Sequence, residues 1–269
     1  MNNPLLSLDS ALLSQKMKTH FLGRNLTLYP VLDSTNEELF RNLEQNPKLP
    51  HGSTVIARQQ TQGRGRQGNA WYSSSVEGLY LSFVWRPKLL PEDFVWLTLV
   101  LGLGVAHTLE VFSFSPRIKW PNDIHCSGKK VAGILMESRN LNPEDPVFVA
   151  GIGINLNQDT LPENLGQPVA SLKQLRQEAI PPNEFCCTLL EQLEKTLRRL
   201  ESGDKKALLK EISARSLFLQ KQVCLYFKGN EYYGTMEGFS EKLGILVRLE
   251  GGTLQEFPGE ITTLRAYEP

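Results

Sequence analysis

A glycine- and arginine-rich stretch, QTQGRGRQGNAW at residues 60–71, is the segment of this sequence best suited to chemistry. Its glycines would let successive backbone amides converge on an anion, and each arginine can grip a carboxylate or phosphate through two hydrogen bonds. It lacks the G-K-[ST] of a Walker loop, and we do not interpret it as a dinucleotide-binding fingerprint. An ordinary arginine-bearing surface loop remains the alternative.

Two further segments carry charge at the ends of apolar runs. In IKWPNDI (118–124), Lys119 and Asp123 bracket a turn fixed by Pro121, and Asn122 with Asp123 offers hard oxygen ligands for a magnesium ion held by nucleotide phosphates. GKKVAGILMES (128–138) follows, and a hairpin between the two segments would bring Lys130 beside Asp123. The alternative, in which neither segment has a functional role, is a turn that ends a strand and lysines at a strand end that keep the protein soluble.

Small residues stand where a ligand would need close approach to a strand. Gly133 lies within one apolar run, and GIGINLN (151–157) ends another with two glycines and two asparagines. Asn155 could bond a ribose or a phosphate. The alternative is a buried strand that finishes in a turn.

The helices and strands that must position these residues can be predicted from the sequence, and together they indicate an α+β body followed by a small β-barrel. Period-2 and apolar runs predict body strands at residues 26–32, 53–59, 78–87, 116–120, 129–138 and 146–157. Helical patterns cover residues 33–46, 91–112, 183–202 and 204–216, with a capping box at Ser34 and Glu37 and a core helix at 91–112. Five short strands are expected at 221–227, 231–239, 244–250, 253–259 and 261–267.

The composition argues against several other classes of protein. The 269 residues include 29 basic and 29 acidic side chains, so the formal net charge is zero, which disfavours a nucleic-acid-binding module. The four cysteines suit neither a zinc site nor a disulfide framework, and adjacent Cys186 and Cys187 are expected to be buried. We see no signal peptide and no membrane span, and the four histidines show no catalytic spacing. We therefore expect a cytoplasmic protein with an electrostatic, anion-gripping site.

The order of the motifs is more specific than any one of them. DSTNEE, QTQGRGRQGNAW, KWPNDI, GKKVAGILMES and GIGINLN, together with PGEITTLR near the end, resemble the biotin–protein ligases over residues 33–265. The resemblance implies a catalytic domain related to class II aminoacyl-tRNA synthetases at residues 1–215, with 1–25 as an extension, and an SH3-like barrel at 216–269. It also implies ATP with Mg²⁺ and biotin as substrates. Biotin would be activated as biotinyl-adenylate and then transferred to a lysine of the biotin carboxyl carrier protein of acetyl-CoA carboxylase.

The resemblance also implies roles for individual residues. The expected biotin-binding residues are Ser34, Thr35, Asn36, Gln60, Gly63, Arg64, Lys130, Gly133, Gly151 and Gly153. The expected ATP-binding residues are Arg66, Trp71, Lys119, Asn122, Asp123, Lys130 and Asn155, with Asp123 beside the metal. Lys130, Arg64 and Arg66 are the expected catalytic charges.

The sequence departs from the family pattern in the arginine loop, where Asn69 and Ala70 replace frequent basic residues and Ser74 replaces a frequent proline. Because the residues before DSTN are too few for a winged helix-turn-helix, we expect no DNA-binding role. Strand edges near residues 151–157 could pair with a second copy, giving a homodimer, or with the carrier domain. A lipoate–protein ligase, which shares the fold and the acyl-adenylate chemistry, is the nearest alternative.

Overall fold

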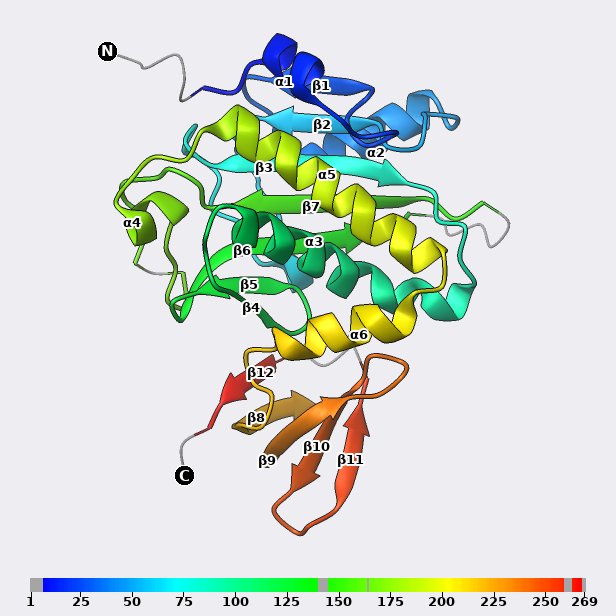
Figure 1. Cartoon of the computed structure of the whole chain (residues 1–269), viewed down its shortest axis with the longest axis vertical. Helices are drawn as coiled ribbons and strands as arrows, with labels where there is room; N and C mark the ends of the chain where they lie inside the picture. The colour runs from blue at the N-terminus through cyan, green and yellow to red at the C-terminus, as the bar shows by residue number, and fades with distance from the viewer. Residues whose placement is uncertain (1–6, 140–144, 164, 259–262, 268–269) are drawn as a thin grey trace.

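The computed structural model describes residues 7–139, 145–163, 165–258 and 263–267. Among these residues, a layered body lies above a small all-β unit (Figure 1). The body contains a seven-stranded sheet in the order β1-β2-β3-β7-β6-β5-β4, in which β1 and β2 pair in parallel and the other neighbours antiparallel. Its strands are β1 (Leu26–Tyr29), β2 (Thr54–Ala57), β3 (Leu79–Trp85), β4 (Pro116–Lys119), β5 (Asp123–Cys126), β6 (Lys129–Glu137) and β7 (Phe148–Ile154).

Helices cover the two faces of this sheet unequally. α3 (Leu97–Val111) and α5 (Pro182–Glu201) lie on one face, whereas α2 (Thr35–Gln45) packs on β2, β3 and β7. Neighbouring residues of β3 show that these are opposite faces, since Val84 belongs to the apolar cluster beneath α2 and Phe83 to the main core. On the face that carries α2, β6 is therefore left open for other contacts.

The predicted core helix is confirmed, with one refinement. Its first six residues form a 3₁₀ segment, η3 (Pro91–Trp96), before α3 begins. A methyl group at Gly104 of α3 would lie 3.0 Å from the Leu193 side chain, so this glycine permits close packing against α5. The segment Pro91–Val111 is long and apolar enough to cross a membrane, but 67% of its most apolar window is buried inside the protein. Its apolar character is that of a core helix.

Three shorter helices complete the described body: α1 (Ser10–Lys16), α4 (Leu172–Arg176) and α6 (Lys205–Ala214). The first two were not predicted, because five to seven residues give too little periodicity. The described part of the expected N-terminal extension is packed, since α1 lies on α5 and Leu13 is fully buried. Glu194 of α5 accepts backbone N–H bonds from residues 20, 21 and 22 at 2.7–3.0 Å, which fixes the chain entering β1.

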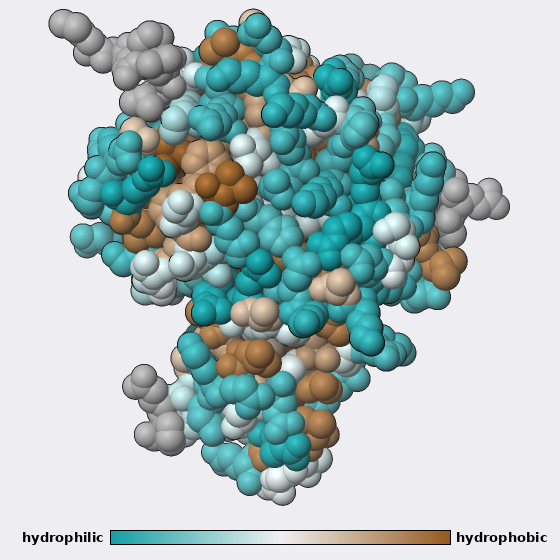
Figure 2. All heavy atoms as spheres, viewed as in Figure 1, coloured by the Kyte–Doolittle hydropathy of each residue, from teal (hydrophilic) through white to brown (hydrophobic). Residues whose placement is uncertain are grey.

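The small unit is an antiparallel sheet in the order β11-β10-β9-β8-β12, counted over the described residues. Its strands are β8 (Gln222–Phe227), β9 (Asn230–Phe239), β10 (Ile245–Leu249), β11 (Leu254–Phe257) and β12 (Thr263–Ala266). All five expected strands are found, although residues 259–262 of the PGEITTLR motif lie outside the described part. The SH3-like assignment and the domain boundaries stay predictions. Figure 2 shows more hydrophobic side chains over this sheet than over α5 and α6.

The connection between the two units covers one edge of the body sheet. The N–H of Ile118 in β4 donates to the carbonyl of Arg215 at 2.7 Å, and the N–H of Leu217 donates to the carbonyl of Ile118 at 2.9 Å. The chain leaving α6 thus pairs with β4, and the buried core runs continuously from the body into the small unit.

Two sequence-based expectations are wrong. Ser34 is the N-cap of α2 but its side chain makes no capping bond, and Glu37 instead pairs with Arg64 and Arg139, so the capping box does not form. The strand at 151–157 offers no free edge either. Residues 151–154 of this segment lie in β7, which is paired on both sides by β3 and β6.

Candidate active site

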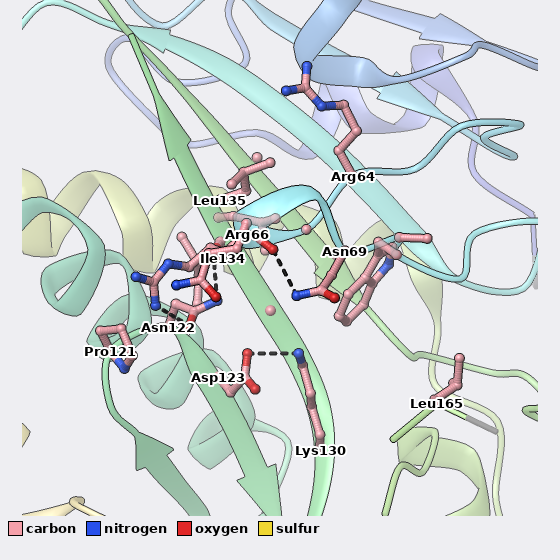
Figure 3. A pocket seen from close by; sticks show the side chains of 18 of the residues that line it. Arg64, Arg66, Asn69, Pro121, Asn122, Asp123, Lys130, Ile134, Leu135 and Leu165 are labelled. Atoms are coloured by element: carbon pink, nitrogen blue, oxygen red, sulfur yellow. Dashed lines mark hydrogen bonds and ion pairs between the residues drawn. The ribbon is translucent and has the colours of Figure 1, made fainter. Parts of the chain in front are cut away.

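A cavity of about 720 Å³ opens on the face of the sheet that carries α2, above β6 and β7 (Figure 3). Sixteen residues were singled out from the sequence as binding or catalytic groups, and fourteen of them line it. These fourteen are Ser34, Thr35, Asn36, Gln60, Arg64, Arg66, Trp71, Lys119, Asn122, Asp123, Lys130, Gly133, Gly151 and Gly153. The motifs, spread over 120 residues of sequence, therefore meet in one place.

The arginine-rich loop forms a small hairpin along one side of this cavity. The N–H of Trp71 donates to the carbonyl of Gly63 at 2.9 Å, and the N–H of Gly65 donates to the carbonyl of Asn69 at 2.7 Å. A 3₁₀ turn, η2 (Arg66–Gly68), makes the tip, where Gly68 has φ +77° and so suits glycine. Because both arms of the hairpin are hydrogen-bonded, Arg64 and Trp71 are held at its base and Arg66 at its tip.

One end of the cavity is polar, uncharged and buried. Asn36, Thr35 and Ser82 form a continuous set of contacts, with Ser82 Oγ 2.5 Å from Asn36 Oδ1 and 2.6 Å from Thr35 Oγ1. Gln60 Oε1 accepts the Thr35 N–H at 2.8 Å. Ser82 is fully buried, and Thr35, Asn36 and Gln60 are each less than 8% exposed. Such an end can offer fixed donors and acceptors to a flat polar group.

The opposite end is charged and is built from three parts of the chain. Lys130 Nζ lies 2.7 Å from Asp123 Oδ1, as the hairpin argument predicted. Lys119 donates to Gln167 Oε1 at 3.0 Å, and Gln167 in turn donates to Asp123 Oδ2 at 3.3 Å. Arg265 of β12 also lines this end. Burial lowers the pKa of Lys119, and the positive charges of Lys130 and Arg265 lower it further.

Arg66 reaches the same end from the tip of the hairpin. Its Nη1 donates to Asn122 Oδ1 at 3.2 Å (Figure 3), and burial lowers the pKa of its guanidinium. Among the described lining residues at this end, the cations Arg66, Lys119, Lys130 and Arg265 face one carboxylate, Asp123. Four positive charges and one negative charge leave a net +3. An excess of this size suits a polyanion such as a triphosphate.

His125 of β5 lies behind the charged end and adds nothing to this balance. It is 5% exposed, and burial lowers the pKa of its imidazole to about 4. The ring is therefore neutral at physiological pH.

A strip of glycines joins the two ends, and two side chains lie directly on it. A methyl group at Gly153 would lie 2.4 Å from the Trp71 ring, one at Gly133 2.8 Å from the same ring, and one at Gly151 2.3 Å from Asn36 Oδ1. Trp71 thus occupies the strip between the ends, with Lys130 Nζ 5.1 Å from its ring centroid. The glycines allow Trp71 and Asn36 to approach the strands closely, and the close approach of a ligand stays a prediction.

Arg64 lines the cavity but points away from the Asp123–Lys130 pair (Figure 3). Its guanidinium forms ion pairs with Glu37 and, at 2.8 Å, with Glu137. Both carboxylates compete with any anion for this side chain. The catalytic and biotin-binding roles expected for Arg64 stay predictions.

Two expected site residues are absent from the described residues that line the cavity. A methyl group at Gly63 would lie 2.2 Å from Ser73 Oγ, so this glycine lets the two arms of the hairpin approach. Asn155 is 4% exposed, and its backbone N–H donates to the carbonyl of Val131 at 2.8 Å. Its position supports the end of β7, and its expected contact with ATP stays a prediction.

Four residues of the site were missed by sequence reasoning: Ser82, Glu137, Gln167 and Arg265. Ser82 carried a usable signal, since it is the one small polar side chain in the largely apolar run LYLSFVW. Glu137 stands at the end of an apolar strand and resembles any solvated strand-end charge. Gln167 and Arg265 reach the site only through tertiary packing and have no local signal.

The oxygen ligands near Asp123 limit how a magnesium ion could bind at this site. Among the described residues, no three His, Cys, Asp or Glu side chains come together. Both oxygens of Asp123 already accept hydrogen bonds from Lys130 and Gln167. The site therefore fits a magnesium ion held mainly by nucleotide phosphates, with Asp123 as a single protein carboxylate, rather than a dedicated protein cage.

Comparisons with known proteins agree with this geometry. A model of the biotin/lipoate A/B protein ligase family matches residues 28–157. The chain is 30% identical to the bifunctional ligase/repressor BirA of Escherichia coli, over 91% of this chain and 76% of that protein. It is 28% identical to the biotin–[acetyl-CoA-carboxylase] ligase of Mycobacterium tuberculosis, over 90% of each.

The fold is likewise similar to that of solved enzymes. The biotin protein ligase of Aquifex aeolicus, solved in complex with biotin and ATP, superimposes with a TM-score of 0.78 and 32% identity, covering 91% of this chain and all of that one. The mixed α+β architecture and the small C-terminal β-unit are thus those of this enzyme class. The chain belongs to the biotin/lipoate A/B protein ligase family, in which its relatives are biotin protein ligases.

Proposed function

We propose that this ligase activates biotin as biotinyl-5′-AMP and then transfers the biotinyl group to a lysine of a biotin carboxyl carrier protein. The observation that carries the proposal is the cavity with unlike ends, one neutral and hydrogen-bonding, the other with a net charge of +3. Biotin has the matching polarity, because a cyclic urea and a carboxylate lie at opposite ends of an apolar body.

In the first half-reaction, a carboxylate oxygen of biotin would attack the α-phosphorus of ATP and pyrophosphate would leave. Two anions must approach each other, so positive charge between them lowers the barrier. Lys130 and Arg66 would supply this charge, and their positions beside Asp123 and Asn122 at the same end support these roles. Mg²⁺ bound to the phosphates would supply further shielding of their charge.

Lys119, Asn122 and Arg265 would bind the nucleotide at this end, while Ser34, Thr35, Asn36 and Gln60 would hold the urea. Closure of the hairpin that carries Arg66 and Trp71 would exclude water from the mixed anhydride. In the second half-reaction, the amine of the carrier lysine would attack the acyl carbon and expel AMP.

The first test is ATP–pyrophosphate exchange with biotin and with lipoate as alternative substrates. Both acids must be compared because the family contains ligases for each of them. We expect biotin to elicit exchange and lipoate to elicit none. Exchange with lipoate alone would replace this proposal by a lipoate–protein ligase.

The second test is transfer to the apo carrier domain of acetyl-CoA carboxylase, followed by intact mass. The carrier should gain one biotinyl group, and a carrier with arginine at the acceptor lysine should gain none. Exchange without transfer would mean that the acceptor has been wrongly assigned.

A further inference from the structure

We propose that Glu137 is a positioning residue that fixes the donor and acceptor pattern of the polar end, and thereby its recognition of a cyclic urea. The inference rests on the proposed function. It concerns a residue outside the cavity lining, at the end of β6, on the same face of the strand as Gly133 and Leu135.

The side-chain amide of Asn36 has two possible orientations, which exchange its oxygen and its NH₂ group. Its Nδ2 lies 2.8 Å from Glu137 Oε2. Glu137 is ion-paired with Arg64 and is therefore a carboxylate, which can only accept hydrogen bonds. The NH₂ group of Asn36 must therefore face Glu137, and its carbonyl oxygen must face Ser82.

The orientation of Asn36 then determines the two hydroxyl groups. Ser82 has a single proton, and it must donate this proton to Asn36 Oδ1 at 2.5 Å, because that oxygen cannot donate. Ser82 can then only accept from Thr35, whose hydroxyl lies 2.6 Å away. The direction of this series of hydrogen bonds, from Thr35 through Ser82 to Asn36, thus follows from the negative charge of Glu137.

The result is an acceptor pair that a ligand N–H would satisfy. With its proton given to Ser82, Thr35 Oγ1 keeps its lone pairs, and Gln60 Oε1 lies 3.2 Å from it. Gln60 cannot be turned, because its Oε1 accepts the Thr35 backbone N–H at 2.8 Å. Two adjacent acceptors recognise an N–H donor, as a cyclic urea presents. If the hydrogen bonds ran in the opposite direction, from Asn36 through Ser82 to Thr35, the Thr35 hydroxyl could donate to Gln60. The pair of acceptors would then be lost.

Glu137 has a second contact that must be separated from this one. Its other oxygen holds Arg64 at 2.8 Å, so loss of Glu137 also releases the base of the hairpin. Glu37 provides a matched control, because it too is ion-paired with Arg64 but, among the described residues, its side chain forms no hydrogen bond with Asn36, Ser82 or Thr35. The side chains of Glu37 and Glu137 are similarly exposed, at 25% and 21%.

The test compares Glu137→Gln with Glu37→Gln in biotin-dependent ATP–pyrophosphate exchange. Glutamine keeps the length of the side chain but can turn either its NH₂ or its carbonyl group to Asn36. Glu137→Gln should raise the KM for biotin roughly tenfold, as expected for loss of a charged hydrogen bond, while the KM for ATP changes less than about twofold. Glu37→Gln should raise the KM for biotin much less.

Ser82→Ala gives a second, independent reading, since it removes the donor to Asn36 without touching Glu137 or Arg64. It should raise the KM for biotin in the same direction, again with little change in the KM for ATP. Equal effects of Glu137→Gln and Glu37→Gln would overturn the inference and assign the effect to Arg64. So would a normal KM for biotin in Ser82→Ala. Absence of biotin-dependent exchange in the unmodified protein would instead refute the proposed function itself.

Discussion

The two ends of the cavity are built in different ways. At the polar end, Thr35, Asn36 and Ser82 come from the first turn of α2 and the middle of β3, are buried, and hydrogen-bond to one another. At the charged end, the lining side chains come from the hairpin tip, the ends of β4, β5 and β6, the loop at residues 165–167, and β12 of the small unit. The polar end is built from a helix and a strand that are packed in the sheet and its covering layer, whereas the charged end is assembled from strand ends and loops.

This difference suggests a division of labour. A preorganised polar end costs little to bind to and can discriminate between neutral groups by their donors and acceptors. The charged end holds four cations together against one carboxylate, so an anionic ligand would remove part of their mutual repulsion. We therefore expect substitutions at the polar end to alter biotin binding, and those at the charged end to alter the nucleotide steps.

The largest effect is expected for Lys130→Ala at the charged end. Loss of this charge should lower the rate of biotin-dependent exchange on the order of 10²-fold or more, the usual cost of removing one electrostatic stabiliser. The measurement is the exchange rate at saturating ATP and biotin. Lys129→Ala is the matched control, because Lys129 is adjacent in β6 but exposed. Equal losses in the two variants, or near-normal exchange in Lys130→Ala, would remove Lys130 from the mechanism.

The next largest effect is expected at the polar end, for Gly151→Ala. The added methyl group would lie 2.3 Å from Asn36 Oδ1 and would force Asn36 to move, at a cost of about 1–3 kcal/mol. The KM for biotin should rise roughly tenfold or more. Gly153→Ala in the same strand should raise it less, since its methyl group meets Trp71, which is carried by the hairpin. A larger rise for Gly153→Ala would mean that the hairpin is the more rigid of the two sites.

Most of the elements could be predicted from the sequence, because long strands and helices carry strong periodicity. The errors lie where tertiary contacts decide. Glu37 had the spacing of a capping box but forms ion pairs with Arg64 and Arg139 instead, and neither partner is near it in sequence. The free edge expected near residue 151 is lost because β3, which is distant in sequence, pairs there.

The site was predicted in part for the same reason. Local motifs identified Lys130 and Asp123 as neighbours, because a short hairpin fixes their distance. They could not show that Trp71 lies on the glycine strip, or that Gln167 bridges Lys119 and Asp123. Those contacts depend on how loops pack, which no period in the sequence encodes.

A smaller, kinetic effect is expected for Arg66→Gly. The substitution removes a cation from the charged end and the contact with Asn122 from the hairpin tip. The half-life of the biotinyl-adenylate on the purified enzyme should fall by about tenfold, equivalent to one ordinary charged hydrogen bond. Dissociation is followed after a chase with unlabelled intermediate. An unchanged half-life would show that the hairpin closes without Arg66.

The smallest effect is expected for Arg265→Ala, which tests whether the small unit takes part in the charged end. Arg265 lines the cavity and lies close enough to Lys119 to lower the pKa of its ammonium group. Because it is one of four cations there, its loss should raise the KM for ATP only a few-fold, in keeping with a partly screened charge, and should leave the KM for biotin unchanged. Arg248→Ala is the control, since Arg248 of β10 is ion-paired with Glu237 in the same unit. If both variants raise the KM for ATP alike, the small unit acts through its stability; if only biotin binding responds to Arg265→Ala, the assignment of the two ends is wrong.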